Sequence, residues 1–216
     1  VALDYSVNDA TPYLSSYTVD PTFTSTQTHD GSQNKNTSCT GNPTGGAASA
    51  NNYIDGGSGV ACYRTYMEWD ISSIPNFATI SDVSVEFDIT GDNGAVYDIY
   101  SMETTPSNES NTSTALWDDM RDGDNYINDQ GGSTGVTTLD LGSTSDSNLQ
   151  SDLASKDVFA IGLSKGDGET TGSRYYKAFA AEEHSTSQTP TLTVSYTLPT
   201  QPSAPANLSA VSGIPI

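Results

Sequence analysis

The chain has 216 residues, with 27 acidic and 7 basic side chains and a formal net charge of −20 at pH 7. So large a negative charge argues against nucleic acid or an anionic membrane surface as a partner, because both would repel it. Only 34% of the residues are hydrophobic and no apolar run is long enough to span a bilayer, so no membrane insertion is predicted in this segment.

Two extended stretches, at residues 1–7 and 13–19, are predicted near the start of the chain. A polar, glycine-rich segment follows at residues 25–61 and predicts a long surface loop. Long loops in compact domains are commonly functional or linker-like, so this segment is the first place where binding is expected.

The two cysteines of the chain are Cys39 and Cys62. An even number of cysteines in a chain of secreted appearance predicts one disulfide. The alternative is a pair of unrelated buried thiols. A zinc site is not expected, because only His29 and His184 are available to complete it.

Two strands with alternating apolar residues are predicted to form the centre of an all-β sandwich. They cover residues 63–71 and 81–90, and alternation over this length is typical of a strand with one buried face. The side chains predicted to form the two inward stripes are Tyr63, Thr65, Met67, Trp69, Ile71, Val83, Val85, Phe87 and Ile89.

The rest of the chain adds short strands and two short helices. Strands are predicted at residues 95–102, 136–141, 157–164, 175–181 and 191–196, and helices at residues 113–120 and 148–156.

Residues 1–198 are therefore predicted to form one sandwich domain. Residues 199–216 form a proline-rich, extended linker that ends in an isolated strand at residues 207–216. We expect this strand either to begin a further domain of a longer protein or to pair with another copy of the chain.

Four Asn-x-Ser/Thr sequons predict glycosylation in loops or linkers of an exported protein. Their asparagines are Asn36, Asn108, Asn111 and Asn207.

Clustered carboxylates suggest a structural calcium ion, because hard cations prefer oxygen ligands. The alternative is a solvated acidic surface that keeps a secreted protein soluble. The carboxylates considered as calcium ligands are Asp88 and Asp92, and, around Gly123, Asp118, Asp119, Asp122 and Asp124.

Aromatic side chains are the natural platforms for sugar rings, and the chain has twelve tyrosines. The principal candidates for stacking on a glycan are Tyr66, Trp117, Tyr126 and Tyr175, with Tyr63 and Tyr176 considered beside them. The alternative is that most of these rings fill the sandwich or its rim with the hydroxyl in water.

The segment Gly162–Gly166 matches the nucleophile-elbow pattern around Ser164, with Asp167 and His184 following in hydrolase order. That pattern requires a strand, a sharp turn and a helix. Here a Gly/Asp-rich loop follows, so no catalytic residue is predicted and the chain is interpreted as noncatalytic.

Several motifs resemble those of DNRLRE-type domains over residues 60–197. They are Arg64 followed by Met67-Glu-Trp-Asp-Ile-Ser-Ser-Ile-Pro75, Ala78-Thr-Ile80, Trp117-Asp-Asp-Met-Arg-Asp-Gly123, Phe159-Ala-Ile-Gly-Leu163, Phe179-Ala-Ala-Glu-Glu-His184 and Pro190-Thr-Leu-Thr-Val-Ser-Tyr196. The resemblance implies a jelly-roll-like antiparallel β-sandwich, related to carbohydrate-binding modules, in an extracellular or cell-surface protein. Residues 202–210 resemble the beginning of a fibronectin type III domain.

Two functions follow as expectations. The first is a structural or adhesive building block of a cell-surface protein or extracellular filament, whose partners are other copies of itself or neighbouring domains. A terminal strand added to an open sheet edge of a neighbour would join such copies. The second is a carbohydrate-binding module of a secreted polysaccharide-active or adhesive protein.

Overall fold

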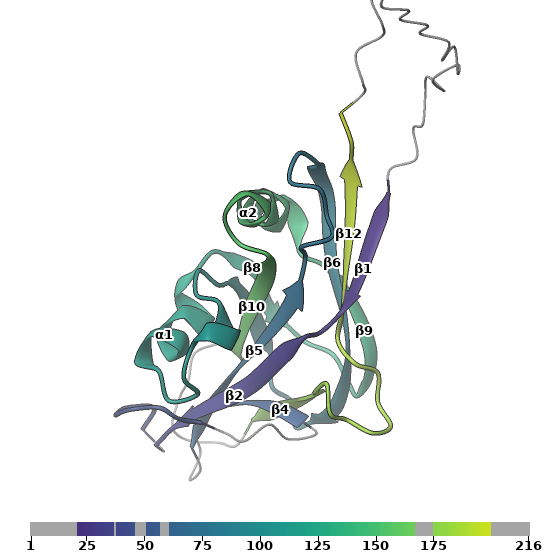
Figure 1. The fold of residues 1–216 in the computed structure, drawn as a ribbon. Helices are drawn as coiled ribbons and strands as arrows, with labels where there is room; N and C mark the ends of the chain where they lie inside the picture. Colours follow the sequence, from purple (N-terminus) through teal and green to yellow (C-terminus); the bar gives the residue numbers. More distant parts are fainter. Residues whose placement is uncertain (1–20, 37, 46–50, 57–60, 167–174, 200–216) are drawn as a thin grey trace, which may run out of the picture.

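The structure is a computed structural model that describes residues 21–36, 38–45, 51–56, 61–166 and 175–199. Antiparallel strands dominate it, and two short α-helices lie against the strands (Figure 1). The all-β sandwich class predicted from the sequence is confirmed.

The strands are β1 (Thr22–Thr26), β2 (His29–Lys35), β3 (Thr44–Gly45), β4 (Asn51–Gly56), β5 (Cys62–Asp70), β6 (Thr79–Asp92), β7 (Tyr97–Ser101), β8 (Asn125–Gln130), β9 (Gly135–Asp140), β10 (Val158–Lys165), β11 (Tyr176–Ala180) and β12 (Thr191–Thr197). The helices are the 3-10 turn η1 (Pro106–Asn108), α1 (Thr114–Asp122) and α2 (Gly142–Ser155).

One hydrogen-bonded sheet runs in the order β1-β12-β6-β11-β4-β5-β10-β7-β8, with β9 paired to β6 and β2 paired to β5. Every strand pair is antiparallel in the part of the chain that the structure describes. The sheet curls so that its β6–β12 part faces its β5–β10 part across one core (Figure 1).

The alternation of β5 and β6 places their apolar side chains in this core, as predicted. Met67 and Trp69 from β5 pack in the same cluster as Val85 and Phe87 from β6, and all four are fully buried. The indole Nε1 of Trp69 donates a hydrogen bond to the carbonyl of Pro190 at 3.3 Å. Leu149 and Leu153 of α2 join the same core.

The outer face of β5 is also buried, which the alternation did not predict. Tyr66 and Glu68 are 0% and 3% exposed. Helix α1 covers this face with Leu116 and Met120. The 3-10 turn η1 also contacts it, because the Ser107 amide donates a hydrogen bond to Glu68 Oε2 at 3.0 Å. The half-buried strand expected from the sequence is therefore a strand enclosed on both sides.

The prediction of one polar loop over residues 25–61 is wrong, because β2, β3 and β4 lie within it. These strands were missed because most of their buried side chains are polar, Ile54 of β4 being the apolar exception. Ser32 Oγ lies 2.8 Å from Thr65 Oγ1, and Thr65 Oγ1 donates to the carbonyl of Tyr53 at 2.8 Å. Such polar strands carry no apolar alternation from which they can be recognised.

The disulfide predicted between Cys39 and Cys62 is confirmed, with a Cα–Cα distance of 5.3 Å. It ties the connection after β2 to the first residue of β5.

Helix α2 begins at Gly142, six positions before the start predicted at residue 148. The prediction missed the first turns of the helix because they are rich in serine rather than apolar residues. No helix in the described segments is both long enough and apolar enough to cross a bilayer. The strands predicted at residues 1–7, 13–19 and 207–216 lie outside the described residues.

Candidate functional site

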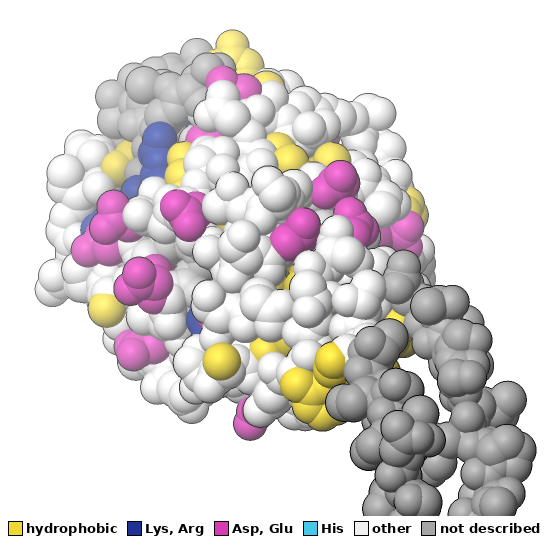
Figure 2. All heavy atoms as spheres, turned by 90° about the horizontal axis from the view of Figure 1, so that it is seen from above, with side chains coloured by type: hydrophobic (Ala, Val, Ile, Leu, Met, Phe, Trp, Pro, Cys, Tyr) yellow, Lys and Arg dark blue, Asp and Glu magenta, His cyan; other side chains and the backbone are white. Residues whose placement is uncertain are grey.

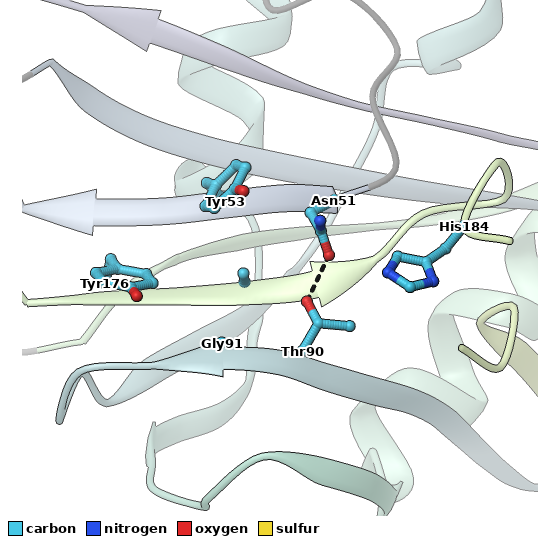
Figure 3. Close-up of a pocket in the computed structure, with 7 residues that line it drawn as sticks. Asn51, Tyr53, Thr90, Gly91, Tyr176 and His184 are labelled. Carbon is cyan, nitrogen blue, oxygen red and sulfur yellow. Dashed lines mark hydrogen bonds between the residues drawn. The ribbon is translucent and has the colours of Figure 1, made fainter. Parts of the chain in front are cut away.

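A hollow of about 370 Å³ opens on the face formed by β4, β11 and β6 (Figure 3). Its floor is formed by Gly91 and Ala178, which have little or no side chain. The other lining residues are Asn51, Tyr53, Thr90, Tyr176 and His184.

The hollow exists because small residues meet at one row of the sheet. Ala178 in the middle of β11 lies opposite Tyr53 of β4 on one side and Gly91 of β6 on the other. A Cβ atom placed on Gly91 would lie 3.3 Å from the Ala178 Cβ and 3.4 Å from Cε2 of Tyr176. Any larger residue at Gly91 would therefore fill the floor.

A β-bulge brings a hydroxyl to this hollow. The pairing of β11 with β6 shifts between Ala178, which faces Gly91, and Phe179, which faces Ile89. Thr90 is the residue skipped by this shift, and such bulges redirect a side chain out of the regular ladder. Thr90 Oγ1 donates a hydrogen bond to Asn51 Oδ1, and this bond crosses over β11 (Figure 3).

His184 presents one ring nitrogen toward the same end of the hollow. Its Nδ1 accepts hydrogen bonds from the amides of Ser187 at 2.9 Å and Thr186 at 3.4 Å. Neutral His184 therefore carries its proton on Nε2 and offers a donor there. The ring lies beside the Asn51–Thr90 pair in Figure 3.

The turn that carries His184 is held by a buried carboxylate. Asp30 Oδ2 accepts a hydrogen bond from the amide of Glu182 at 3.0 Å, and His184 closes the turn by donating its amide to Ala181 at 3.1 Å. Burial raises the pKa of Asp30 to about 6, and the nearby charge of Glu183 adds to the rise, while the Glu182 amide opposes it. The position of His184 therefore depends on a carboxylate from β2.

No carboxylate is found among the described residues that line the hollow, in a chain whose net charge is −20. Figure 2 shows Asp and Glu side chains spread over the end of the molecule where β1 begins and β12 ends. The hollow is thus a polar but uncharged surface within an acidic molecule.

A second hollow of about 440 Å³ lies beside α2 and contains three carboxylates, from Glu103, Asp124 and Asp152. Lys156 Nζ lies 3.2 Å from Asp152 Oδ1 and donates to the carbonyl of Met102 at 3.1 Å. Burial raises the pKa of Asp152 to about 6, although the charge of Lys156 opposes this rise. Lys156 is thus paired with Asp152, and Asn148 donates hydrogen bonds to Asp124 and Tyr126 within the second hollow, so we take the first hollow as the stronger candidate.

The four principal glycan-stacking candidates do not line the first hollow. Tyr66 and Trp117 are 0% and 1% exposed, so neither ring has a free face for a sugar in this structure. Tyr126 is half-buried and stacked on Phe159, and its hydroxyl accepts a hydrogen bond from Asn148 Nδ2 at 3.0 Å. Tyr175 is 47% exposed.

From the sequence, Tyr176 was considered as a glycan-stacking residue, Tyr53 was not named as a site residue, and His184 was considered for a zinc site and for a catalytic triad. The structure brings these three side chains together although they lie on three separate segments of the chain.

The acidic residues proposed as calcium ligands are dispersed or engaged. Asp119 accepts hydrogen bonds from the amides of Thr104 at 2.9 Å and Glu103 at 3.2 Å, and Asp92 pairs with Lys177 at 2.9 Å. The remaining positions are Asp88 in β6, Asp118 and Asp122 in α1, and Asp124 just before β8. In the segments that the structure describes, no three metal-ligating side chains converge. Calcium binding stays a prediction.

Three of the four predicted glycosylation sites can be placed. Asn36, Asn108 and Asn111 are exposed. Asn36 Oδ1 accepts hydrogen bonds from the amides of Ser38 and Thr40, each at 3.0 Å, and Asn111 Oδ1 accepts one from the Tyr66 hydroxyl at 2.9 Å. Asn207 lies outside the described residues.

Ser164 lies inside β10 rather than at a turn between a strand and a helix. It is fully buried and pairs with Asp98 of β7. This geometry differs from that of a nucleophile elbow, in which the serine must be exposed at a sharp turn. Asp167 lies outside the described residues.

Comparison with known protein families finds no match to this chain, and comparison with curated proteins finds no related sequence. The resemblance to DNRLRE-type domains therefore stays a prediction.

Proposed function

We propose that this chain is a noncatalytic, extracellular β-sandwich module that serves as a structural or adhesive building block of a cell-surface protein or filament. The observation that carries the proposal is a separation within the sheet. β1 begins and β12 ends at one end, whereas the hollow on β4, β11 and β6 opens toward the other.

Both chain connections lie at one end of the sheet. β1 pairs with β12, with Thr22 opposite Ser195. β6 begins beside the same end, where Thr79 pairs with Thr197, and it reaches the hollow at Gly91. At about 3.3 Å per residue, the twelve steps from Thr79 to Gly91 span roughly 40 Å. In Figure 1, β1 begins and β12 ends at the top, whereas β4 lies at the bottom.

A module with this arrangement is held at one end and presents its binding surface at the other. An adhesive protein needs this separation, because its attachment must not cover its ligand. The disulfide between Cys39 and Cys62 supports an extracellular location, since disulfides persist in oxidising compartments.

A sheet edge also offers a place for an added strand. Among the described strands, β9 pairs only with β6, and Val136 on β9 is 54% exposed. A donated strand would satisfy its open backbone groups. The segments 1–7 and 207–216, predicted from the sequence to be extended, are the strands we propose for exchange between copies.

Deletion of residues 1–7 or 207–216 tests this exchange, with particle size measured by light scattering and electron microscopy. We expect at least one deletion to abolish polymers, and Val136→Lys to weaken them by placing charge on the edge. Because each copy carries a net charge of −20, polymers should also grow more readily at higher salt, which screens the repulsion between copies. Unchanged assembly of both deleted chains would exclude strand exchange.

Carbohydrate binding is the second function that a specific observation favours. The hollow combines two tyrosine rings with amide, hydroxyl and imidazole groups, the mixture that small polar ligands require. A glycan screen with and without calcium tests this function and the calcium prediction together.

A further inference from the structure

We infer that the hollow on β4, β11 and β6 is a binding subsite for one ring of a neutral polysaccharide. The inference rests on the proposed adhesive role, for which it names the ligand class and the residues that recognise it.

The hollow has an aromatic end and a polar end. Figure 3 shows Tyr53 and Tyr176 toward one end, and Asn51, Thr90 and His184 toward the other. A sugar ring is amphipathic in the same way, because its C–H groups form apolar patches and its hydroxyl groups lie around the rim. Tyrosine rings can contact such C–H patches.

The polar end supplies hydrogen-bonding groups of both kinds. Nε2 of neutral His184 is a donor, because Nδ1 is occupied as an acceptor by the amides of Ser187 and Thr186. The hydroxyl oxygen of Thr90 donates to Asn51 and retains a lone pair that can accept. A hydroxyl group of a sugar can both accept and donate a hydrogen bond, so it can accept from His184 Nε2 and donate to the Thr90 hydroxyl oxygen.

The floor fixes how closely a ring can approach. Gly91 and Ala178 leave the backbone of two strands near the surface. The volume of about 370 Å³ lies near the lower limit of about 300 Å³ for small-molecule sites. This size favours a single ring or a short part of a chain rather than a long enclosed oligosaccharide.

The charge of the hollow and of the whole chain favours a neutral sugar over an acidic one. Among the described residues that line the hollow, none is a Lys or Arg that could pair with a uronate or sulfate group. The rest of the molecule carries a strong negative charge, which would repel an acidic polymer. The ligand class is therefore a neutral polysaccharide.

The test uses the full chain and isothermal titration calorimetry with cellohexaose, maltohexaose, mannohexaose and a galacturonic acid hexamer. Tyr176→Ala and Tyr53→Ala each remove one ring of the hollow. Tyr175→Ala is the matched control, since Tyr175 is 47% exposed and lies next to Tyr176 in the chain but does not line the hollow. Near-ultraviolet circular dichroism and thermal unfolding establish that each variant is folded.

We expect at least one neutral hexamer to bind, and each hollow variant to bind it about tenfold more weakly. The Tyr175→Ala variant should bind within twofold of the unaltered chain. Failure of folded protein to bind any of the three neutral hexamers overturns the inference. So does binding of the acidic hexamer alone, or neutral binding that both hollow variants retain.

Failure of the ligand assignment can be distinguished from failure of the proposed adhesive and structural role. A chain that still assembles, as judged by light scattering, but binds no neutral hexamer contradicts only the ligand assignment. A chain that binds a hexamer through Tyr53 and Tyr176 but never assembles contradicts only the structural part of the proposed function.

Discussion

The guanidinium of Arg64 lies over the ring of Trp117, with Cζ 4.5 Å from the ring centre, and its Nη1 donates a hydrogen bond to the Trp117 carbonyl at 2.7 Å. The ammonium of Lys35 lies 4.8 Å from the centre of the same ring. Two of the seven basic residues are thus used to fix the only tryptophan of α1. These contacts explain why Trp117 anchors a helix to the sheet instead of facing a ligand.

Replacement of Arg64 by Ala should lower the free energy of unfolding by about 2 kcal/mol, because it removes a cation–π contact and a hydrogen bond to a carbonyl. Arg64→Lys should recover part of this loss, since lysine keeps the charge but not the planar fork. Urea unfolding of the two variants measures the difference. Equal stability of Arg64→Ala and the unaltered chain would mean that the stack contributes nothing.

The central strands were predictable because their pattern is local. Met67 and Trp69, two residues apart, must lie on one face of an extended chain, and they do. The covering of the opposite face by α1 was not predictable, because it depends on where a helix 50 residues later packs. Burial of Tyr66 is a consequence of that packing and not of the strand itself.

Lys177 illustrates a buried charge that no sequence pattern reveals. Its side chain is 0% exposed, and Nζ donates to Asp92 Oδ1 at 2.9 Å and to the carbonyl of Gly132 at 2.7 Å. These bonds tie β11 to the end of β6 and to the segment before β9. Lys177→Met should therefore destabilise the fold by about 3 kcal/mol, because it removes the cation that pairs with Asp92 and a donor to the Gly132 carbonyl.

The double variant Lys177→Met with Asp92→Asn provides the control for this ion pair. If the loss comes from leaving Asp92 charged and unpaired, the double variant should be more stable than Lys177→Met alone. Chemical unfolding of the single and double variants completes the cycle. Additive effects of the two substitutions would show that the pair is not coupled.

The disulfide should contribute most of its stability through the unfolded chain. Cys39 and Cys62 are separated by 23 residues, and closing a loop of that size stabilises by about 3 kcal/mol in the chain-entropy model. The double variant Cys39→Ser with Cys62→Ala should lose about this amount in urea unfolding. The unaltered chain treated with reductant should match the variant, and a variant as stable as the oxidised chain would contradict the prediction.

The hollow could not be predicted from the sequence, because its residues are far apart along the chain. Its residues come from positions 51–53, 90–91, 176–178 and 184, and only the sheet order β4-β11-β6 makes them neighbours. The local signals were two small residues within strands, Gly91 in β6 and Ala178 in β11, the latter two positions after Tyr176. Asn51 and Tyr53 lie within the long polar segment where binding was expected, and both line the hollow, although they belong to a strand and not to a loop.

The carboxyl of Asp30 should make the stability of the fold depend on pH. Its pKa rises from 3.8 to about 6, chiefly because the side chain is buried between β2 and β4, with Glu183 and Glu182 adding negative charge and the Glu182 amide and Asn52 opposing the rise. The folded chain therefore binds this proton more tightly than the unfolded chain. The resulting stabilisation is fully present below pH 3.8 and is lost as the pH rises through about 6.

Asp30→Asn isolates this contribution, because it keeps an acceptor for the Glu182 amide but does not titrate. Between pH 4.5 and pH 7 the free energy of unfolding of the variant should fall less than that of the unaltered chain, by an amount on the order of 2 kcal/mol. Asp152→Asn is the matched control for the second carboxyl whose pKa is raised to about 6, and it should remove a separate part of the slope. Urea unfolding across this pH range measures both effects. If Asp30→Asn and the unaltered chain show parallel curves, the carboxyl that holds the His184 turn does not ionise in this range.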